Sequence, residues 1–453
     1  MQPLPKEFEE QMKRLLGEAG FFAYLDALNQ PYTRALRVNL LLRPDGTPPC
    51  PIEGLGAPVP WAKGAYFVEG DARPGLSPLH EGGLFYMQEP SALTAVTVLD
   101  PQPGERVLDL CAAPGGKSTQ IAALMAGRGL LCCNEPIPSR AQILSRNIER
   151  MGVRNAVVLS AMPDALAPRF PAFFDRILVD APCSGEGMFR RQPEARDEWD
   201  ADAPRRCADR QMEILAQAAK MLRPGGTMVY STCTFNDTEN EGVLKRFLAL
   251  HPEFSLVPFA LPGLPEAKDG YLHLYPHEMR GEGHFVSRLK KADGADEADA
   301  PVQAAPQRKA PARAAAKGKA PAPIALPDVF SDAFAPERLY TAGDALWMLP
   351  EGISIERLSG LRVLRTGLLL AHAEGKRSEP DHALAMALRP EEAARTASLT
   401  QTQALAYQAG ETLSLGDLPG GYTLLCCEGV SLGWGKQAGG LMKNHYPKGL
   451  RRR

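Results

Sequence analysis

The segment Val107–Ser118 reads V-L-D-L-C-A-A-P-G-G-K-S and joins a short apolar run to a turn of small residues. Such a turn lets a ligand approach the backbone N–H groups at the start of a following helix. A phosphate-binding P-loop needs glycine five positions before Gly116, where Cys111 stands, and the dinucleotide pattern G-x-G-x-x-G is also absent. The turn therefore predicts a nucleoside ligand that is not held through a phosphate.

An acidic residue follows the next apolar run at the distance expected for a ribose contact. Glu135 comes 20 residues after Gly115, just past the run Leu130–Asn134. A carboxylate at this position can accept hydrogen bonds from both ribose hydroxyls. Together with the turn, it favours S-adenosylmethionine as the cofactor. An ordinary strand-to-helix turn with a surface glutamate is the alternative.

Strand-like and helical patterns alternate around this turn. The expected strand–helix pairs are Arg106–Cys111 with Lys117–Ala126, Leu130–Asn134 with Ser139–Met151, Phe174–Asp180 with Arg205–Leu222, and Thr227–Thr232 with Glu239–Leu250, followed by a late strand at Gly283–Leu289. Repeated β-α-β connections predict an α/β fold with an open parallel sheet and helices on both faces.

The flanking segments differ in composition. Residues 1–75 offer a helix over Glu7–Glu18 and a strand around Leu36–Leu42, and Ala292–Pro327 has 14 Ala and 6 Pro among 36 residues, which is typical of a linker. Residues 328–453 hold enough Leu, Trp and Tyr for one or two small domains of short strands. The predicted division is an N-terminal extension (1–75), an α/β domain (76–291), a linker (292–327) and a separable C-terminal region (328–453), so that a chain ending near Lys291 is expected to fold.

Overall composition excludes several classes of protein. Of the 453 residues, 44% are hydrophobic and 23% charged, as in globular proteins, and no run approaches 18 apolar residues. The nine cysteines include two adjacent pairs and no C-x-x-C, which argues against a zinc ribbon or a disulfide framework. A cytoplasmic location is expected. Because the net charge is −2, a nucleic acid partner has to be held by local basic patches.

Two cysteines follow two different expected strands. Cys183 comes shortly after Asp180 at the end of one strand, and Cys233 comes just after Met228–Tyr230 in another. In an open α/β sheet both face the cleft at the carboxyl ends of the strands. Two thiols beside a methyl donor suit methylation of a pyrimidine at C5, in which a thiolate adds to C6 and a second group helps remove the C5 proton. The Asp180 carboxylate suits a hydrogen bond to the ring at N3. The alternative for either thiol alone is a small buried residue.

These motifs carry a family resemblance. L-D-L-C-A-A-P-G-G-K-S at 108–118, D-A-P-C-S-G-E-G at 180–187 and Y-S-T-C-T at 230–234 resemble the Sun/nucleolar-protein family of RNA (cytosine-5) methyltransferases. The resemblance implies a Rossmann-like S-adenosylmethionine methyltransferase sheet, with Cys233 as the thiol that attacks C6 and Cys183 as the thiol that assists release. It also implies cofactor contacts from Cys111, Ala112, Ala113, Pro114, Gly115, Gly116, Lys117, Glu135 and Asp180. The stretch Ser160–Asp164 departs from the family pattern, which usually has an acidic or amide residue for the adenine amino group. Asp164 or the backbone is the substitute, and the sequence leaves both open.

The C-terminal end interleaves aromatic and basic residues. From Gly433 onward there are six Lys or Arg and no acid, with Trp434 and Tyr446 among them, so phosphate contacts and base stacking are expected. A solvated basic tail is the alternative. The segment resembles the PUA-like RNA-binding extension of the RsmF-like branch, which acts on 16S ribosomal RNA. His277 and His284 have no clustered third ligand, which favours structural or RNA-contacting roles over metal binding.

The function expected is therefore methylation of cytosine C5 in RNA, most plausibly 16S ribosomal RNA. The same chemistry on transfer RNA is one alternative. A catalytically idle RNA-binding factor for ribosome assembly is the other, and the presence of both Cys183 and Cys233 argues against it.

Overall fold

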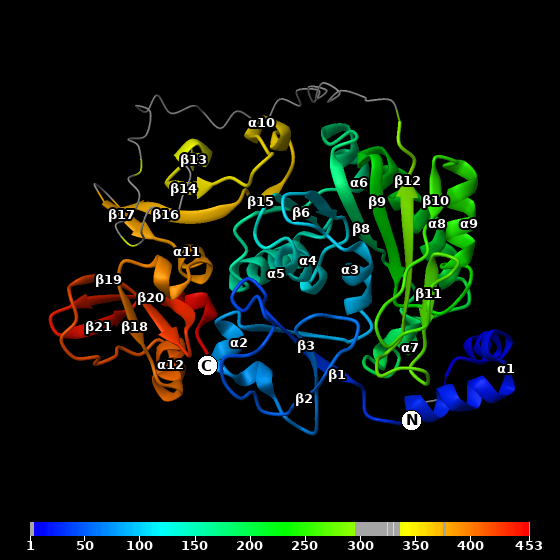
Figure 1. Ribbon diagram of the computed structural model, residues 1–453, viewed down its shortest axis with the longest axis horizontal. Helices are drawn as coiled ribbons and strands as arrows, with labels where there is room; N and C mark the ends of the chain where they lie inside the picture. The colour runs from blue at the N-terminus through cyan, green and yellow to red at the C-terminus, as the bar shows by residue number, and fades with distance from the viewer. Residues whose placement is uncertain (1–3, 295–323, 325–328, 330–335, 375–376, 453) are drawn as a thin grey trace.

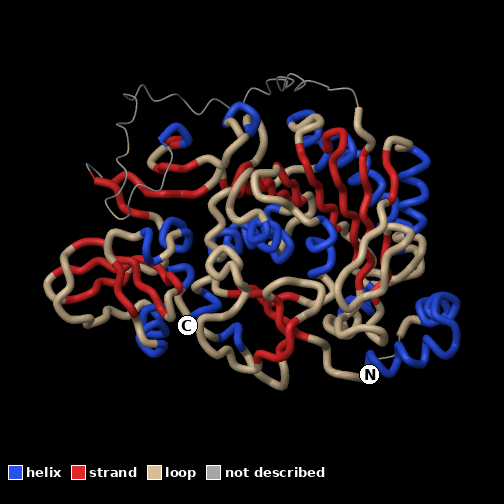
Figure 2. Tube along the Cα trace, viewed as in Figure 1, coloured by secondary structure: helices blue, strands red, loops and turns tan. Residues whose placement is uncertain are grey.

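The computed structural model describes residues 4–294, 324, 329, 336–374 and 377–452. In the view of Figures 1 and 2, a large central sheet lies at the upper right, a small N-terminal sheet at the bottom, and two C-terminal sheets at the left. Nearly all of the expected linker, 292–327, lies outside the described residues. Within the described ranges, no helix has the length and apolar character needed to span a membrane.

The N-terminal region consists of one long helix and a four-stranded sheet. The elements are α1 (Lys6–Leu28), β1 (Arg34–Val38), β2 (Leu55–Pro58), β3 (Ala65–Val68), α2 (Pro78–Glu81) and β4 (Phe85–Gln88), with strand order β2-β3-β1-β4. The sheet therefore crosses the boundary expected at residue 75. The helix extends ten residues beyond the predicted Glu18 because the chain continues as helix after a kink at Gly17 (φ 68°). The strand ends at Val38, earlier than predicted, because the Asn39 side chain accepts from Leu41 N (3.1 Å) and starts a turn.

The central sheet confirms the α/β prediction. Its strands are β5 (Arg106–Asp109), β6 (Leu130–Asn134), β7 (Ala156–Leu159), β8 (Phe174–Asp180), β9 (Leu222–Thr232), β10 (Phe254–Leu256), β11 (Tyr271–Leu274) and β12 (His284–Lys291), and its helices are α3 (Leu93–Leu99), α4 (Gly116–Leu124), α5 (Pro138–Arg150), α6 (Pro163–Leu166), α7 (Glu194–Glu198), α8 (Ala203–Met221) and α9 (Glu241–Leu250). The order is β10-β12-β9-β8-β5-β6-β7-β15, in which β15 is Val363–Arg365. Strands β5 to β9 run parallel, and β12 runs antiparallel to β9.

Alternate residues of each strand pack into separate cores on the two faces of this sheet. Along β6, Leu131 and Cys133 face the core that contains Leu144 of α5, whereas Cys132 faces the core that contains Leu215 of α8. All five residues of β6 are buried, as expected for a parallel strand covered on both sides. The expected strands and helices of this domain lie within a few residues of the observed ones, except that β9 begins earlier, at Leu222.

The C-terminal region contains short strands, as predicted. One sheet comprises β13 (Leu339–Ala342), β14 (Ala345–Met348), β16 (Leu368–Glu374) and β17 (Arg377–Pro380), and the other β18 (Thr396–Ser398), β19 (Gly421–Cys427), β20 (Val430–Ala438) and β21 (Leu441–Asn444). The helices α10 (Ile355–Leu358), α11 (His382–Ala387) and α12 (Gln401–Ala409) accompany them.

The C-terminal region, which the sequence predicts to be separable, contacts the rest of the fold at two places. Strand β15 (Val363–Arg365) adds antiparallel to β7 at the edge of the central sheet, and Ser160 N donates to Arg362 O (2.9 Å). Arg365 pairs with Glu149 of α5. The C-terminal region also shares a hydrophobic core with the N-terminal sheet, in which residues such as Tyr407 and Leu432 pack with Leu36 and Phe85. The C-terminal region therefore packs against both the central sheet and the N-terminal sheet.

The aromatic residues expected to stack on RNA bases are core residues. Trp434 and Tyr446 are 2% and 3% exposed. The Trp434 indole N–H donates to Asp381 O (2.8 Å), and Tyr446 makes an edge contact with Tyr407. Trp434 lies in β20, whose residues are mostly buried. The stacking prediction is wrong for both residues, and so is the alternative of a solvated tail.

Candidate active site

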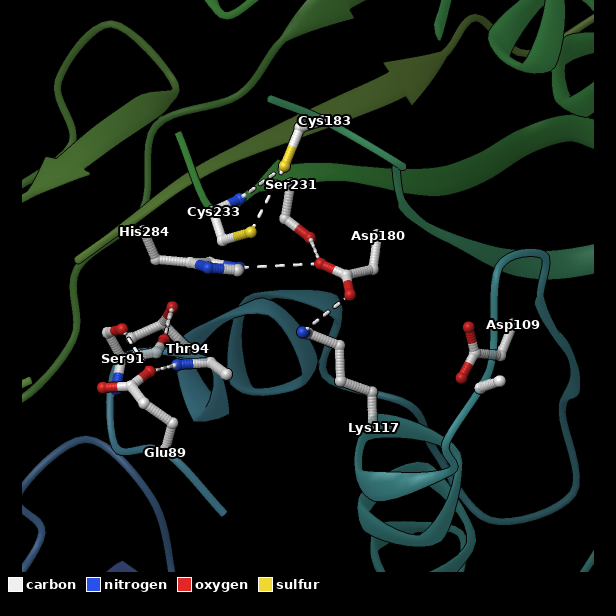
Figure 3. A network of polar contacts seen from close by, with 12 residues as sticks. Glu89, Ser91, Thr94, Asp109, Lys117, Asp180, Cys183, Ser231, Cys233 and His284 are labelled. Atoms are coloured by element: carbon white, nitrogen blue, oxygen red, sulfur yellow. Dashed lines mark hydrogen bonds and ion pairs between the residues drawn. The ribbon is translucent and has the colours of Figure 1, made fainter. Parts of the chain in front are cut away.

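The sequence-predicted site residues come together at one edge of the central sheet. The glycine-rich turn joins β5 to α4, Glu135 follows β6, Asp180 ends β8 and leads to Cys183, and Cys233 follows β9. These four strands are neighbours in the order β9-β8-β5-β6, and all run parallel. Their carboxyl ends therefore bring the turn, the carboxylates and both thiols to one edge of the sheet, part of which is shown in Figure 3.

An ion pair forms the centre of this site. Lys117 Nζ lies 2.8 Å from Asp180 Oδ2, with the two side chains 14% and 28% exposed. Ser231 Oγ donates to Asp180 Oδ1 (2.8 Å). Burial by itself would raise the pKa of Asp180, but Lys117, His284 and the two hydrogen bonds outweigh it, so the pKa lies below its ordinary value. Asp180 is thus ionised at neutral pH, with both of its oxygens already in use.

The two thiols are in direct contact. Cys183 Sγ lies 3.2 Å from Cys233 Sγ, and Cys233 N donates to Cys183 Sγ (3.3 Å). Both side chains are half-buried. The hydrogen bond to Cys233, followed by burial, raises the pKa of Cys183 well above its ordinary value. The raised pKa favours the protonated form of Cys183.

Two buried glutamates fix the loops that carry the thiols. Glu239 accepts from Ser184 N (3.0 Å) and from Asn236 Nδ2 (2.8 Å). Glu186 accepts from Phe235 N (2.8 Å) and from Asn236 N (3.0 Å). Burial raises the pKa of Glu239. The loops after β8 and β9 are thereby tied to each other, which sets the distance between the thiols. In the sequence, Glu186 is one residue of a matched motif and Glu239 is the start of an expected helix, and nothing in their spacing indicates a bond across two loops.

The glycine-rich turn is held from behind by α5. Gly115 has φ 113° and directly precedes α4, a conformation that favours glycine. Arg140 Nη2 donates to Ala113 O (3.2 Å), and Asn147 Nδ2 donates to Pro114 O (2.9 Å). Behind the turn, burial raises the pKa of the Cys111 thiol, so this residue is a neutral packing group.

The surroundings of Glu135 suit an adenosine. Glu135 is 3% exposed, accepts from Ile137 N (3.0 Å), and lies 3.3 Å from Arg140. Ile137 and Met162, at the ends of β6 and β7, are 48% and 61% exposed, and Ser160 Oγ ties their loops together by donating to Pro136 O (3.2 Å). Two exposed apolar side chains on the loops that follow β6 and β7 are the kind of surface that suits an adenine ring.

Two further observations concern acidic residues near the glycine-rich turn and β7, Asp109 and Asp164. Within the described part of the chain, Asp109 Oδ1 is buried without a hydrogen-bond partner, and burial raises the pKa of Asp109 to about 7. Asp164, one of the two substitutes expected for the adenine contact, is exposed in the first turn of α6. The residues present thus fit a nucleoside cofactor.

One site residue was missed at the sequence level. Arg37 on β1 is 1% exposed and donates to Gly116 O (3.3 Å) and Thr119 Oγ1 (2.9 Å). Burial lowers its pKa to about 10. The N-terminal sheet therefore anchors the first turn of α4, from which Lys117 extends. No pattern in the sequence distinguishes an arginine with this role from an ordinary strand residue.

Family models match four parts of the chain. They are described as 16S rRNA methyltransferase RsmB/F (residues 96–290), the N-terminal domain of 16S rRNA methyltransferase RsmF (4–90), the RsmF rRNA methyltransferase first C-terminal domain (327–388) and the methyltransferase RsmF PUA domain (394–452). The ribosomal RNA small subunit methyltransferase F of Erwinia tasmaniensis is 34% identical, over 98% of this chain and 96% of its own. That of Escherichia coli O127:H6 is 33% identical over the same shares.

The chain belongs to the RsmB/F family of 16S rRNA methyltransferases. Membership confirms the family predicted from the motifs, and with it an RNA methyltransferase that carries a C-terminal PUA domain.

Solved structures agree with this assignment. A methyltransferase homologue from Pyrococcus horikoshii is 31% identical, with a TM-score of 0.53 over 63% of this chain and 95% of its own. NSun6 from Pyrococcus horikoshii, determined with SFG, shares the fold at 23% identity, with a TM-score of 0.55 over 64% of this chain and 99% of its own.

Proposed function

We propose that this protein methylates C5 of a cytosine in 16S ribosomal RNA, with S-adenosylmethionine as the methyl donor and Cys233 as a covalent nucleophile. The observation that carries the mechanism is the pair of thiols, 3.2 Å apart and adjoining the Lys117–Asp180 ion pair. The family membership and the PUA domain support RNA as the substrate, and the relatives of the whole chain are named for the small-subunit RNA.

The cofactor is assigned to the surface between the glycine-rich turn and β7. Residues 111–117 provide the backbone of the turn, Glu135 the ribose contact, and Ile137 and Met162 the cover for the adenine. Bound there, S-adenosylmethionine supplies an electrophilic methyl group on a sulfonium sulfur. Asp180 borders the same space at the next strand end.

Attack starts from the Cys233 thiolate. Its sulfur forms a bond to C6 of the cytosine, and the C5–C6 π electrons move to C5 and the N3 side of the ring, which makes C5 nucleophilic. Asp180 and Lys117 hold an anion and a cation 2.8 Å apart at the position where the ring edge enters. Asp180 can accept a hydrogen bond from an N–H group of the base, and Lys117 can donate one to an acceptor of the base, as negative charge builds up on the ring.

Release is assigned to Cys183. Its high pKa comes first from the hydrogen bond to Cys233, and that bond is lost once the Cys233 sulfur is attached to carbon. Cys183 then gives its proton to solvent more readily and, as a thiolate, takes the proton from C5. The C5–H electrons re-form the C5–C6 double bond, and the S–C6 bond breaks to return Cys233 as a thiolate.

Substrate capture is assigned to the flanking regions. The N-terminal extension is proposed to recognise RNA beside the catalytic domain, and residues 328–453 to bind RNA through their PUA domain. Since Trp434 and Tyr446 are buried, the exposed basic residues of this region, rather than its aromatics, make the phosphate contacts.

The test combines target mapping with covalent trapping. Bisulfite sequencing of ribosomal and transfer RNA, from cells with and without the gene, is expected to show one protein-dependent 5-methylcytosine in 16S RNA. A site in transfer RNA instead would support the alternative substrate. With purified protein and the mapped RNA, Cys233→Ala is expected to abolish transfer, and Cys183→Ala to accumulate a denaturant-stable protein–RNA adduct.

Cys50→Ala is the matched control for these variants, because Cys50 is a half-buried thiol in the N-terminal region. It is expected to keep full transfer without an adduct. An adduct with Cys233→Ala rather than Cys183→Ala would reverse the two roles, and transfer by a folded Cys233→Ala protein at more than about a hundredth of the wild-type rate would refute the nucleophile.

A further inference from the structure

His284 is a buried histidine that faces the catalytic groups. It is the first residue of β12, and the register Phe285↔Thr232 places it opposite Cys233. The side chain is 2% exposed, and its Nε2 lies 3.7 Å from Asp180 Oδ1 (Figure 3). Within the described residues, Nε2 has no hydrogen-bond partner. A buried polar atom aimed at the reaction centre without a partner indicates a group that the substrate completes.

The imidazole is a neutral donor at this position. Burial, assisted by Lys117, lowers the pKa of His284 to about 3 against the opposing effect of Asp180, so the ring carries no charge at neutral pH. A nitrogen lone pair directed at a carboxylate oxygen would be repelled, which favours the tautomer with the proton on Nε2. Such a neutral ring is a poor base for the C5 proton but a suitable hydrogen-bond donor.

The neighbours of His284 decide which base atom this donor meets. The cofactor residues lie at the ends of β5 and β6, the two thiols at the ends of β8 and β9, and His284 on β12 beyond them. Asp180 is assigned to the N3 side of the ring, and His284 Nε2 lies 3.7 Å from Asp180 Oδ1. Of the two groups that flank N3, the amino group at C4 donates and O2 accepts, so O2 is the group that a donor at this position meets.

We propose that His284 donates its Nε2–H to O2 of the target cytosine and stabilises the charge that reaches O2 when Cys233 adds to C6. The proposal rests on the proposed function. Addition at C6 sends electron density through N3 to O2, so a donor at O2 binds the adduct more strongly than the ground state. Loss of the donor is therefore expected to lower kcat with little change in KM.

The experiment pairs an atomic change in the RNA with a change in the protein. Transfer is measured on the mapped target RNA containing either cytidine or 2-thiocytidine at the target, because sulfur accepts hydrogen bonds more weakly than oxygen. We expect the wild type to be slowed by about 10- to 100-fold on the thio RNA, as for loss of a hydrogen bond to a charged group. His284→Phe, which keeps an aromatic ring without a donor, is expected to be slowed by a similar factor on cytidine and to be insensitive to sulfur.

Further variants separate this role from a structural one. His284→Gln retains an N–H donor and is expected to recover at least tenfold over His284→Phe and to regain sensitivity to sulfur. His277 is a partly exposed histidine on another segment. The His277→Phe variant is expected to be slowed on the 2-thiocytidine RNA by the same factor as the wild type. Calorimetric affinities for S-adenosylmethionine and for both RNAs are expected to be unchanged in all three variants.

Each outcome separates the hypotheses. If sulfur slows the wild type and His284→Phe equally, or leaves the wild type unaffected, the O2 contact is refuted while the proposed function stands. If the wild type fails to methylate the cytidine RNA, the proposed function is refuted together with the contact that depends on it.

Discussion

Replacing Lys117 by methionine tests the electrostatics of the site. The lysine is the strongest of the groups that keep the pKa of Asp180 low against its burial, and its Nζ lies 2.8 Å from the carboxylate. Methionine retains the aliphatic length but leaves an ionised carboxylate with the Ser231 hydroxyl as its hydrogen-bond donor. The pKa of Asp180 is then expected to rise, and the folded state to lose stability wherever Asp180 is ionised.

The magnitude follows from a hydrogen bond between charged groups that are mostly buried. Such bonds contribute about 1.5–3 kcal/mol, which for a domain of this size corresponds to a decrease in Tm of roughly 3–12 °C near neutral pH. A carboxylate with a depressed pKa in the folded state stabilises above its unfolded pKa and loses that contribution as the pH falls through the folded value. In Lys117→Met the pKa of Asp180 is raised, so acidification protonates the carboxylate that has lost its lysine partner. Protonation removes the free-energy cost of burying its charge. The difference in Tm from the wild type is therefore expected to narrow between about pH 7.5 and pH 4.

Calorimetric melting curves of the full chain at several pH values measure this difference. Lys117→Arg, which keeps the charge, is the matched control and is expected to retain most of the stability. In the double variant Lys117→Met with Asp180→Asn, the dependence of the Tm difference on pH is expected to disappear. Two results would refute the assignment of the low pKa of Asp180 to Lys117. One is a Tm difference between Lys117→Met and the wild type that stays constant with pH. The other is a dependence of the Tm difference on pH that persists in the double variant.

Three other perturbations address the cofactor and the C-terminal region. Glu135→Gln removes one ribose acceptor and is expected to weaken S-adenosylmethionine about tenfold or more by calorimetry, with RNA affinity unchanged; unaltered cofactor binding would contradict the ribose contact. A chain ending after Lys291 lacks β15 and the core partners of Leu36. Size-exclusion chromatography of this chain is expected to show association, and calorimetry is expected to show a weaker affinity for S-adenosylmethionine. A stable monomer with wild-type affinity would show that the C-terminal region is separable. Because Trp434 is buried, Trp434→Ala is expected to lose about 3–5 kcal/mol of stability through formation of a cavity, and Trp434→Phe to lose less than Trp434→Ala. Weakened RNA binding by Trp434→Ala at normal stability would instead support stacking of Trp434 on RNA bases.

The catalytic half of the molecule was predictable because its signals are local. Strands and helices of the central sheet follow from apolar runs of the right length, and the position of Cys183 and Cys233 at one edge follows from the rule for parallel strands. Their contact of 3.2 Å does not follow, because it depends on the loops that Glu186 and Glu239 join across the sheet.

The errors arose where long-range packing overrides local composition. Basic residues around Trp434 suggested an exposed RNA surface, yet the Trp434 indole packs in a hydrophobic core, while Lys436, two residues further along β20, is partly exposed over the Tyr422 ring. The three-residue strand β15 has no periodicity of its own, and its pairing with β7 depends on a partner about 200 residues earlier in the chain. Arg37 is likewise a site residue only because the N-terminal sheet packs against α4.

The pairing of β7 with β15 at the edge of the central sheet can form only late in synthesis of the chain. Ribosomes make proteins from the N-terminus, and domains tend to fold as they emerge. Strand β7 is complete at Leu159, but its edge partner begins at Val363. Until then the outer edge of the central sheet presents unpaired backbone groups, the kind of surface on which other chains add strands. Since Ser160 adjoins the loop assigned to the adenine, the last step in closing the sheet also completes the cofactor wall. A chain that ends upstream of Val363 is therefore expected to leave this edge of β7 unpaired and prone to association.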